Sequence, residues 1–469
     1  MKIADLKDKK IGILGLGVEG LSLYQKLKNE VKNIAVFDQY TEEELVSKSE
    51  PENLDLIKNI LEDPKTVKFL GPEYLKNIGD IDVLFRSPGI SYLNPEIVAA
   101  KERGAIISSQ IKLFIENCPA QIVSVTGTKG KGTTATLIKE LLVRGLGRKI
   151  YLAGNIGLPA ITLLDETTPD DIVVLELSSF QLMDLEISPS VAVVTNLYEE
   201  HLDYHNDDNE YIQAKYNIIA HQNPDDIAIL NINSTFPKEM LSGSKSQKQY
   251  FSKDENKKCR AYIRQNNDKI AEVILVLNQE VIICNQKGIK LLGRHNLENI
   301  AAAALVADNF GIKPKLIKSV VSEFRGLPHR LELVAIKDDI TYIDDSFGTN
   351  PGPAIAAIKA FSEDKILILG GSSKSADFTE MAKEITGTNV VGVVLVGDEG
   401  SKIGDTLVKN GFAGSAIEGG NDMVSIVQNA KKIAKSGQVV ILSPACASFG
   451  LFKNYKDRGE QFKKAVENL

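Results

Sequence analysis

Cysteine, excess basic charge and long apolar runs are all scarce in this chain of 469 residues, and each shortage excludes a class of protein. The four cysteines are scattered and form no C-x-x-C pair, so the sequence indicates neither a zinc site nor a disulfide framework. The net charge is −7, which leaves no basic excess to neutralise the phosphates of a nucleic acid. Nucleic acid is therefore not expected as a partner.

No stretch of the sequence approaches the roughly 18 apolar residues that a membrane-spanning helix requires. The basic N-terminus leads into a short apolar run that ends in glycines, which is typical of a strand and a turn and not of a signal peptide. The chain length predicts about three domains. We therefore expect a cytoplasmic enzyme without a membrane span.

The most informative stretch covers residues 122–134, with the sequence IVSVTGTKGKGTT. Its β-branched start predicts a buried strand, and the apolar spacing after Thr134 predicts a helix. A strand, a glycine-rich loop and a helix N-terminus together form a phosphate cradle, to which Lys131 adds a mobile positive charge. The spacing departs from the standard G-x-x-x-x-G-K-[ST] pattern, because Val125 and Gly132 replace a glycine and a hydroxyl residue. A plain glycine-rich turn is the alternative.

An earlier strand, Ile11–Leu14, leads into a G-x-G-x-x-G motif at residues 15–20, and a second strand, Ile34–Phe37, ends at Asp38. This βαβ pattern is typical of a dinucleotide-binding fold. NAD, FAD and a UDP-sugar all remain open as ligands. Asp38 either contacts a ribose or caps a turn. We expect this first domain to close near residue 110.

In the second domain, the predicted strand Asp171–Leu175 delivers Glu176 at its carboxyl end. The carboxyl ends of parallel strands line the ligand crevice, so we expect Glu176 close to whatever the cradle binds. A carboxylate beside a nucleotide phosphate suits Mg²⁺, which prefers oxygen ligands. A helix-capping acid is the alternative for Glu176.

Four further polar residues in the second domain can be interpreted from the sequence alone. His201 follows a predicted strand, but histidine is a poor magnesium ligand, so a local hydrogen bond is an equal alternative. Lys215 shares a helix face with Tyr211, and a lysine on such a face is usually a solvated charge. Asn296 and Asn299, at the start of an alanine-rich helix, could contact a ligand. Residues 233–290 indicate no function.

A third domain is predicted from residue 327, where strands again end in polar turns marked by glycine or proline. Cys446 lies in one of these turns without a companion His or Asp, so we interpret it as packing. The sequence therefore predicts an α/β protein with three domains at residues 1–110, 111–326 and 327–469. The first and third are expected to be Rossmann-like, and the central one P-loop ATPase-like with a mostly parallel sheet.

The chain resembles the Mur ligases of peptidoglycan synthesis through all three predicted domains. The resemblance is carried by TGTKGKGTT, GNIG, ELSSFQL, EEHLDYH, Tyr-x-x-Ala-Lys, GRHNLEN, LPHRLE, LGGSSKSADF and LSPACASFGLFKNYKDRGEQF, the last two being closest to the glutamate-adding members. It implies an ATP-dependent, ADP-forming ligase that adds D-glutamate to UDP-N-acetylmuramoyl-L-alanine through an acyl phosphate. Mg²⁺ would be required, and a monomer is expected.

The resemblance also implies roles for individual residues. Catalytic roles fall to Lys131, Glu176, His201 and Lys215. Nucleotide contacts fall to Gly127, Thr128, Lys129, Gly130, Lys131, Gly132, Thr133, Thr134, Asn296, Asn299, Arg330 and Asp345. Substrate contacts fall to Gly17, Val18, Glu19, Asp38, Ser87, Asn155, His201, Thr349, Lys374, Ser448 and Tyr455, with UDP on the first-domain loop in place of NAD. The metal would be held by Thr133, Glu176, His201 and Lys215, the lysine as a carbamate.

Several positions depart from the family pattern. Gly132 stands where these ligases usually have a hydroxyl, so Thr133 would have to serve the metal. Phe347 and Gly348 replace a lysine and an alanine, which removes one positive charge near the acyl phosphate or the incoming acid. Gln39 and Tyr40 follow Asp38 where Thr-Arg often stands. These departures leave the choice of glutamate enantiomer open.

Three other functions would each account for part of the sequence. A related ligase could add L-glutamate or another acidic amino acid, of muramyl or folylpolyglutamate type, but the folate enzymes should lack the first domain. An NAD-dependent oxidoreductase would leave TGTKGKGTT, Glu176 and Lys215 unexplained. A non-catalytic nucleotide-binding protein would be expected to have lost the phosphate or metal groups.

Overall fold

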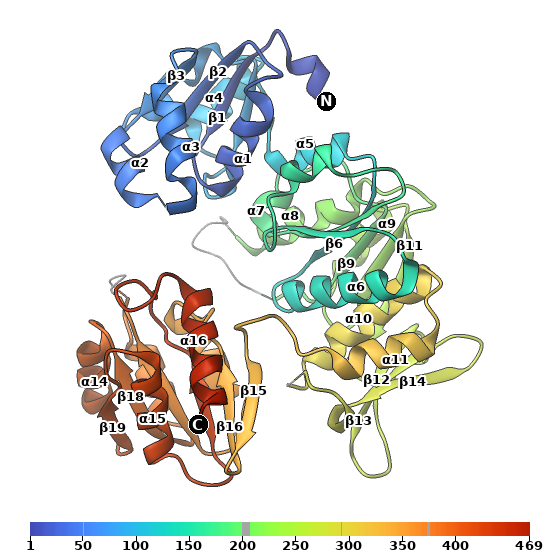
Figure 1. The fold of residues 1–469 in the computed structure, drawn as a ribbon. Helices are drawn as coiled ribbons and strands as arrows, with labels where there is room; N and C mark the ends of the chain where they lie inside the picture. Colours follow the sequence, from blue (N-terminus) through green and yellow to red (C-terminus); the bar gives the residue numbers. More distant parts are fainter. Residues whose placement is uncertain (50, 199–206, 292, 373–375) are drawn as a thin grey trace. The chain divides into compact units, whose positions relative to one another are not determined.

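The computed structural model describes residues 1–469 except 50, 199–206, 292 and 373–375 (Figure 1). The chain divides into two compact units, one formed by Met1–Gln286 with Leu297–Val321 and the other by Lys287–Asn296 with Ser322–Leu469. Three separate sheets run through these units, and most of their strands are parallel. The predicted α/β class is confirmed, whereas the three domain boundaries stay predictions.

The first sheet has the strand order β3-β2-β1-β4-β5, and all of its pairs are parallel. Its strands are β1 (Lys10–Leu14), β2 (Asn33–Asp38), β3 (Thr66–Leu70), β4 (Val83–Arg86) and β5 (Ile106–Ser108). The helices of this part are α1 (Val18–Leu27), α2 (Glu42–Lys48), α3 (Pro51–Glu62) and α4 (Pro95–Glu102). The strand order reverses between β1 and β4, which is the switch point where an open α/β sheet binds its ligand.

The central sheet has the order β14-β13-β12-β11-β10-β9-β6-β8-β7. The half that contains the predicted cradle consists of β6 (Gln121–Thr126), β7 (Ile150–Gly154), β8 (Ile172–Glu176), β9 (Val191–Val194) and β10 (Ile227–Asn231). The remaining strands are β11 (Gln247–Ser252), β12 (Ala261–Gln265), β13 (Ala271–Val276) and β14 (Glu280–Asn285). The pairs β14·β13 and β13·β12, which come first in this order, are antiparallel, so the sheet is parallel where the cradle lies and ends in a hairpin at its far edge.

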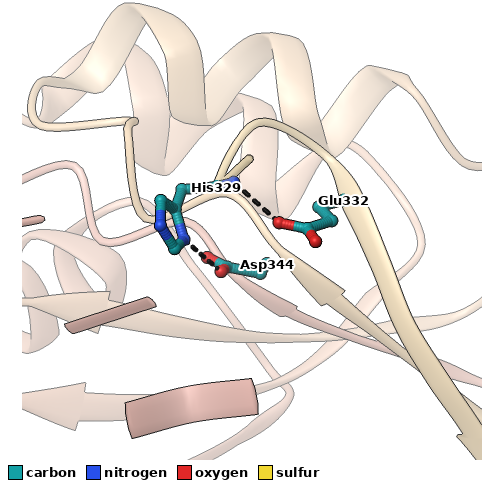
Figure 2. A group of neighbouring side chains, drawn as sticks. All are labelled: His329, Glu332 and Asp344. Carbon is teal, nitrogen blue, oxygen red and sulfur yellow. Dashed lines mark hydrogen bonds and ion pairs between the residues drawn. The ribbon is translucent and has the colours of Figure 1, made fainter. Parts of the chain in front are cut away.

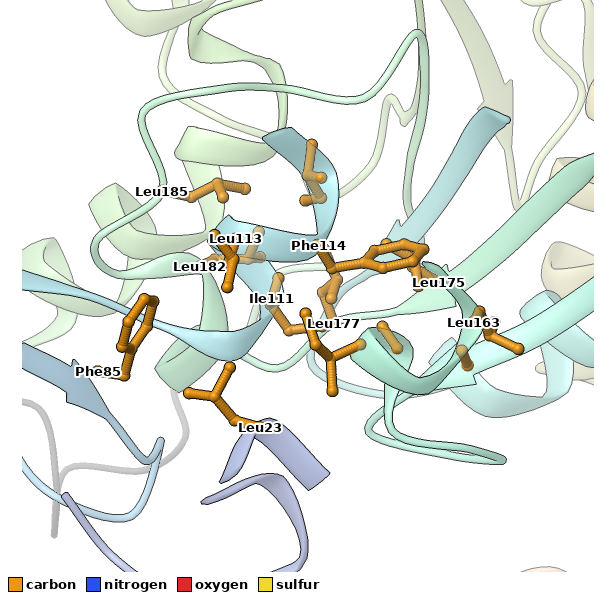
Figure 3. Packing of buried hydrophobic residues seen from close by; sticks show 14 of the residues in the cluster. Leu23, Phe85, Ile111, Leu113, Phe114, Leu163, Leu175, Leu177, Leu182 and Leu185 are labelled. Carbon is orange, nitrogen blue, oxygen red and sulfur yellow. The ribbon is translucent and has the colours of Figure 1, made fainter. Parts of the chain in front are cut away.

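A continuous apolar core joins these two sheets within the first unit (Figure 3). It contains Leu23 of α1, Phe85 of β4, Phe114 of α5 (Gln110–Asn117) and Leu175 of β8, all of them buried. Parallel strands covered on both faces are apolar along their whole length, which explains why β8 is buried at every position. The packing of the core makes both sheets parts of one compact unit.

The second unit contains the sheet β15-β16-β20-β17-β18-β19. Its strands are β15 (Glu332–Lys337), β16 (Ile340–Asp344), β17 (Lys365–Gly370), β18 (Val390–Val396), β19 (Ser415–Glu418) and β20 (Val439–Leu442). Among the described strands of this sheet, β15 pairs antiparallel with β16 and the other pairs are parallel. Helices α12 (Pro351–Lys359), α13 (Thr379–Thr386) and α14 (Gly400–Lys409) contribute to one buried cluster, and α15 (Met423–Ile433) and α16 (Tyr455–Glu467) to another.

None of the helices in the described part of the chain combines the length and apolarity that crossing a bilayer requires.

Candidate active site

The predicted cradle is formed by the end of β6, a glycine-rich loop and the start of α6 (Lys131–Leu146). Gly127 has φ +146°, and a Cβ atom there would lie 2.0 Å from Thr195 Oγ1. Gly130 has φ +83°, and its Cβ would lie 2.3 Å from Asn299 Oδ1. Both the backbone angle and the close neighbours demand glycine at these positions. The strand, loop and helix are confirmed, and Asn299, from α10 (Asn296–Asn309), lies against the loop.

Two lysines converge on one carbonyl oxygen of this loop. Lys131 Nζ donates to Gly127 O at 3.0 Å and to Thr128 O at 3.0 Å. Lys215, on α8 (Asp208–Ala220), donates to the same Gly127 oxygen at 2.9 Å, and its Nζ lies 4.7 Å from the centre of the Tyr211 ring. Only 1% of Lys215 is exposed. The interpretation of Lys215 as a solvated charge was therefore wrong, because the loop covers it.

Residues at the end of β9 hold the loop in place, and the sequence did not single them out. Asn196 Oδ1 accepts from the Lys129 backbone at 2.8 Å, and Thr195 Oγ1 donates to Lys129 O at 2.6 Å. Thr128 Oγ1 also lies 2.9 Å from the Tyr211 hydroxyl. The sequence does contain a signal for Thr195 and Asn196, because they form a polar pair directly after an apolar strand. This is the position at which a parallel sheet presents its ligand-binding residues.

Glu176 ends β8 next to the strand that carries the cradle, with Val125 as its partner in the register. Its side chain is buried. Asn155 contacts it twice, through its backbone N–H to Glu176 O at 2.8 Å and through Nδ2 to Glu176 Oε1 at 3.4 Å. The helix that follows, α7 (Ser179–Leu182), is capped by Ser178. The position expected for Glu176 is confirmed, and its alternative role as a helix cap is wrong.

The loop after β1 gathers several residues of the predicted UDP site. Asp38 Oδ2 accepts from Leu16 N at 2.7 Å, and Ser87 Oγ donates to Gly15 O at 3.1 Å. Asp38 Oδ1 also accepts from the backbone of Tyr40 at 3.0 Å, so of the two roles left open the turn-capping one is present. Gly17 is the N-cap residue of α1, and Val18 is exposed at the start of that helix.

Glu19 ties this loop to the central part of the first unit. Its Oε1 atom accepts from Gln181 Nε2 at 2.6 Å. Arg86 reinforces the junction by donating to Phe180 O at 3.1 Å and pairing with Asp184 at 3.4 Å. Burial raises the pKa of Glu19 above its usual value. The sequence singled out Glu19, as part of the loop expected to bind UDP, but it did not predict any of these contacts.

In the second unit, Asp345 lies at the end of β16 and is buried. Its Oδ2 atom accepts from Ser443 Oγ at 2.6 Å, and its Oδ1 atom accepts from Leu331 N at 3.2 Å. Burial is the largest effect on this carboxyl group and raises its pKa to about 7. The predicted polar turns after β16 and β20 therefore meet at Asp345.

His329, Glu332 and Asp344 form a compact cluster of residue types that can bind metals (Figure 2). His329 Nδ1 lies 2.8 Å from Asp344 Oδ2, and the His329 backbone donates to Glu332 Oε2 at 2.9 Å. Lys463 pairs with Glu332 at 3.1 Å and supplies a positive charge at this point. These bonds connect the segment before β15 to the end of β16, and we assign the cluster to that structural task.

The remaining predicted residues are identified here by their positions along the chain. His201 and Lys374 lie outside the described residues. Thr133 and Thr134 are in the first turn of α6, Asn296 begins α10, Thr349 follows the turn after β16, Ser448 follows β20, and Tyr455 begins α16. Cys446 is buried in an apolar cluster, and burial raises the pKa of its thiol to about 11. A protonated, packed thiol agrees with the packing role expected for it.

Comparison with known proteins gives a consistent result across the chain. The model of the Mur ligase middle domain matches residues 125–307, and that of the Mur ligase glutamate ligase domain matches residues 329–446. The UDP-N-acetylmuramoylalanine--D-glutamate ligase of Ruminiclostridium cellulolyticum is 36% identical, covering 99% of this chain and 98% of its own. The enzyme of the same name from Clostridium acetobutylicum is 37% identical, over 99% of this chain and 97% of its own.

Solved structures agree on the fold. The UDP-N-acetylmuramate-alanine ligase of Thermotoga maritima superposes with a TM-score of 0.54 at 19% identity, over 98% of this chain and 99% of its own. The MurF ligase of the same organism, solved in complex with ADP, gives a TM-score of 0.54 at 15% identity, over 100% of this chain and 97% of its own. The resemblance seen in the motifs is thus confirmed along the full length, and the chain belongs to the Mur ligase family.

Proposed function

We propose that this protein is an ATP-dependent, ADP-forming ligase that joins D-glutamate to UDP-N-acetylmuramoyl-L-alanine in the synthesis of peptidoglycan precursors. The observation that carries the proposal is the closed phosphate cradle, with Lys131 folded over its glycines and Glu176 buried at the end of the adjacent strand. The full-length relatives named UDP-N-acetylmuramoylalanine--D-glutamate ligase supply the choice of substrates.

The chemistry requires a carboxylate to become an electrophile. One oxygen of the terminal carboxylate attacks the γ-phosphorus of ATP, and ADP leaves with the electrons of the broken P–O bond. The amine of the amino acid then attacks the acyl carbon and loses a proton, and the C–O bond breaks to release phosphate. Positioning and neutralisation of charge are the protein's contribution. Lys131 is suited to this task, because it already lies over the loop that would hold the phosphates.

Glu176 and Thr133 offer oxygen ligands of the kind that Mg²⁺ prefers, and the buried position of Glu176 beside the cradle fits such a site. When bound, Mg²⁺ neutralises charge on the transferred phosphoryl group. His201 is proposed as a further ligand of the metal, because it lies in the EEHLDYH motif that carries the resemblance to the family. Asn155 is proposed to orient Glu176 and to contact the muramoyl-alanine end of the substrate, since it bonds Glu176 from the end of the neighbouring strand β7.

Lys215 is proposed to act as a carbamate, formed when its uncharged amine adds CO₂ and loses a proton. The modified side chain would bring another oxygen donor to the metal site. Two observations support the proposal. The side chain is almost completely buried, and its Nζ atom donates to the same carbonyl oxygen as Lys131, so the negative charge of a carbamate would lie close to the Lys131 ammonium group.

The loop from Gly17 to Glu19, with Asp38 and Ser87, is proposed to bind the UDP part of the substrate. Nucleotide contacts are assigned to the cradle, Asn296, Asn299, Arg330 and Asp345. The amino acid is assigned to Thr349, Lys374, Ser448 and Tyr455. We further infer a monomeric cytoplasmic enzyme, with the domain boundaries predicted from the sequence.

The proposal is tested by measuring phosphate release from ATP with the purified protein and Mg²⁺. Release should require both UDP-N-acetylmuramoyl-L-alanine and an amino acid, with D-glutamate preferred over L-glutamate and D-aspartate. Preference for L-glutamate would favour the related ligase and contradict the assigned substrate. Absence of turnover with all three amino acids would contradict the proposal as a whole.

A further inference from the structure

A small internal cavity lies beside α1 in the first unit. It measures about 10 Å³, and the residues that line it include the charged Glu19 and Arg86 and the amide Gln110. Its apolar lining includes Leu23 and Phe85, which belong to the continuous core (Figure 3). Polar side chains thus meet at a cavity within an apolar core, and such groups are costly to bury unless they form hydrogen bonds.

Several polar atoms at this cavity have no hydrogen-bond partner within the described part of the chain. Gln110, the first residue of α5, is only 2% exposed, and its Oε1 and Nε2 atoms are both buried without such a partner. Glu19 accepts a hydrogen bond from Gln181 through Oε1, at 2.6 Å, whereas its buried Oε2 atom accepts none from the described residues. A donor and two acceptors are therefore left over on two residues that line the same cavity.

Size and charge together determine what the cavity can bind. A volume of about 10 Å³ has room for a single water molecule and for no larger ligand. The Arg86 guanidinium group opposes the binding of a cation, and an ionised Glu19 opposes that of an anion. A water molecule can bond Glu19 Oε2 and either end of the Gln110 amide, because water both donates and accepts hydrogen bonds.

The cavity adjoins the loop after β1, which is proposed to bind UDP. Gly20 lines the cavity and packs so closely on this loop that a Cβ atom there would lie 1.9 Å from Gly15 O. Ser87, another lining residue, donates to the same Gly15 oxygen at 3.1 Å. Because the loop and the first turn of α1 pack so closely, an anchor on the Glu19 side chain also restrains the loop backbone.

We propose that the cavity binds one ordered water molecule, which links Glu19 to Gln110 and thereby fixes the loop Gly17–Glu19 relative to α5. Glu19 is then a positioning residue, whose side chain is turned into the protein while the loop contacts UDP through its backbone. The part that concerns UDP rests on the proposed function, whereas the water site depends only on the cavity and its polar atoms.

The water site is tested by crystal structures of the full-length wild type and of Gln110→Leu, at a resolution sufficient to show ordered water. In wild type we expect one water molecule within hydrogen-bonding distance of Glu19 Oε2 and of the Gln110 amide. In Gln110→Leu this water molecule should be absent, because leucine offers it no partner. A dry cavity in wild type, or a direct hydrogen bond between Glu19 and Gln110, would overturn the proposal.

The positioning role is tested by calorimetry with UDP-N-acetylmuramoyl-L-alanine and with Mg²⁺–ADP. Gln110→Leu should weaken binding of the UDP substrate by about two- to tenfold, the size of effect expected from one lost hydrogen bond. The KM for this substrate should rise by a similar factor, with a smaller effect on kcat, and the affinity for Mg²⁺–ADP should not change. Gln279→Leu is the matched control, because Gln279 is exposed in the turn between β13 and β14, and it should alter none of these quantities.

Unchanged affinity of Gln110→Leu for the UDP substrate would overturn the positioning role. An equal loss of affinity for Mg²⁺–ADP would also overturn it, because such a loss indicates a general disturbance of the fold. A wild type that contains the water molecule but does not bind UDP-N-acetylmuramoyl-L-alanine would contradict the proposed function and leave the water site confirmed.

Discussion

The Nζ atoms of Lys131 and Lys215 both donate hydrogen bonds to the carbonyl oxygen of Gly127, at 3.0 Å and 2.9 Å. The two lysines come from different helices, α6 and α8, and one of them is almost wholly buried. Two ammonium groups on one oxygen repel each other unless an anion is close by or one of them is modified. This relationship leads directly to predictions for each lysine.

For Lys131, replacement by alanine should lower kcat by about 10²- to 10³-fold, since removing one donor that stabilises charge in a transition state has an effect of this size. Binding of Mg²⁺–ADP should weaken in parallel, as calorimetry would show. Lys139→Ala is the matched control, because Lys139 lies on the same helix and pairs with its neighbour Glu140 at 3.1 Å. Equal activities of the two variants would remove Lys131 from the catalytic site.

For Lys215, replacement by alanine should abolish turnover, and short-chain carboxylic acids should restore part of it by taking the place of the carbamate. Lys215→Arg separates charge from modification, because arginine keeps the cation but cannot form this carbamate. We expect Lys215→Arg to be inactive. Turnover of Lys215→Ala at the wild-type rate without added acid, or full activity of Lys215→Arg, would contradict the carbamate.

Gly130 and Asn299 should be coupled energetically. Gly130→Ala introduces a Cβ atom at 2.3 Å from Asn299 Oδ1 and a side chain at φ +83°, so we expect a loss of about 2–3 kcal/mol in the free energy of unfolding. Adding Asn299→Ala removes the clashing atoms, and about half of the loss should be recovered while the backbone strain stays. Urea denaturation of the single and double variants measures this. Strictly additive effects would show that the two residues do not touch.

Asp345 should make stability depend on pH. Its pKa is raised to about 7 in the folded protein from 3.8, because burial disfavours the ionised form. The unfolded chain therefore releases this proton at lower pH than the folded one, and its contribution to stability is lost as pH rises from about 4 to about 7. The full effect is about 4 kcal/mol. Asp345→Asn should lack this loss, so the difference between the two unfolding curves should change across that window and be flat outside it.

Much of the fold could be predicted from local patterns in the sequence. β20 is a short run of apolar residues, and β8 is apolar up to its last residue, Glu176. Such runs are typical of buried parallel strands. The segment 233–290 was harder, because β11 lies in a polar stretch and gains its identity from pairing with β10 and β12. Pairing partners distant in the sequence leave little trace in composition.

Some residues of the site could be predicted and others could not, again because contacts between distant parts of the chain leave little trace in the sequence. Glu176 could be placed because it follows an apolar strand, and strand ends meet at one edge of a sheet. Lys215 was misjudged, since its burial depends on Gly127, which is 88 residues away in the chain. The hydrogen bonds of Arg458 could not be predicted from the sequence either. Arg458 donates to Ser346 Oγ at 2.9 Å and to Cys446 O at 3.2 Å, and it thereby links two polar turns. Such contacts require the tertiary structure.

The most direct test of the central claim follows oxygen atoms through the reaction. UDP-N-acetylmuramoyl-L-alanine labelled with ¹⁸O in its terminal carboxylate is incubated with ATP, Mg²⁺, D-glutamate and the wild-type protein, and the released phosphate is analysed by mass spectrometry. An acyl phosphate that expels phosphate by C–O cleavage transfers one ¹⁸O atom to each phosphate formed. We predict phosphate with one ¹⁸O, in equal amount to the amide product. Unlabelled phosphate would show that ATP is hydrolysed by water, and would contradict carboxylate activation.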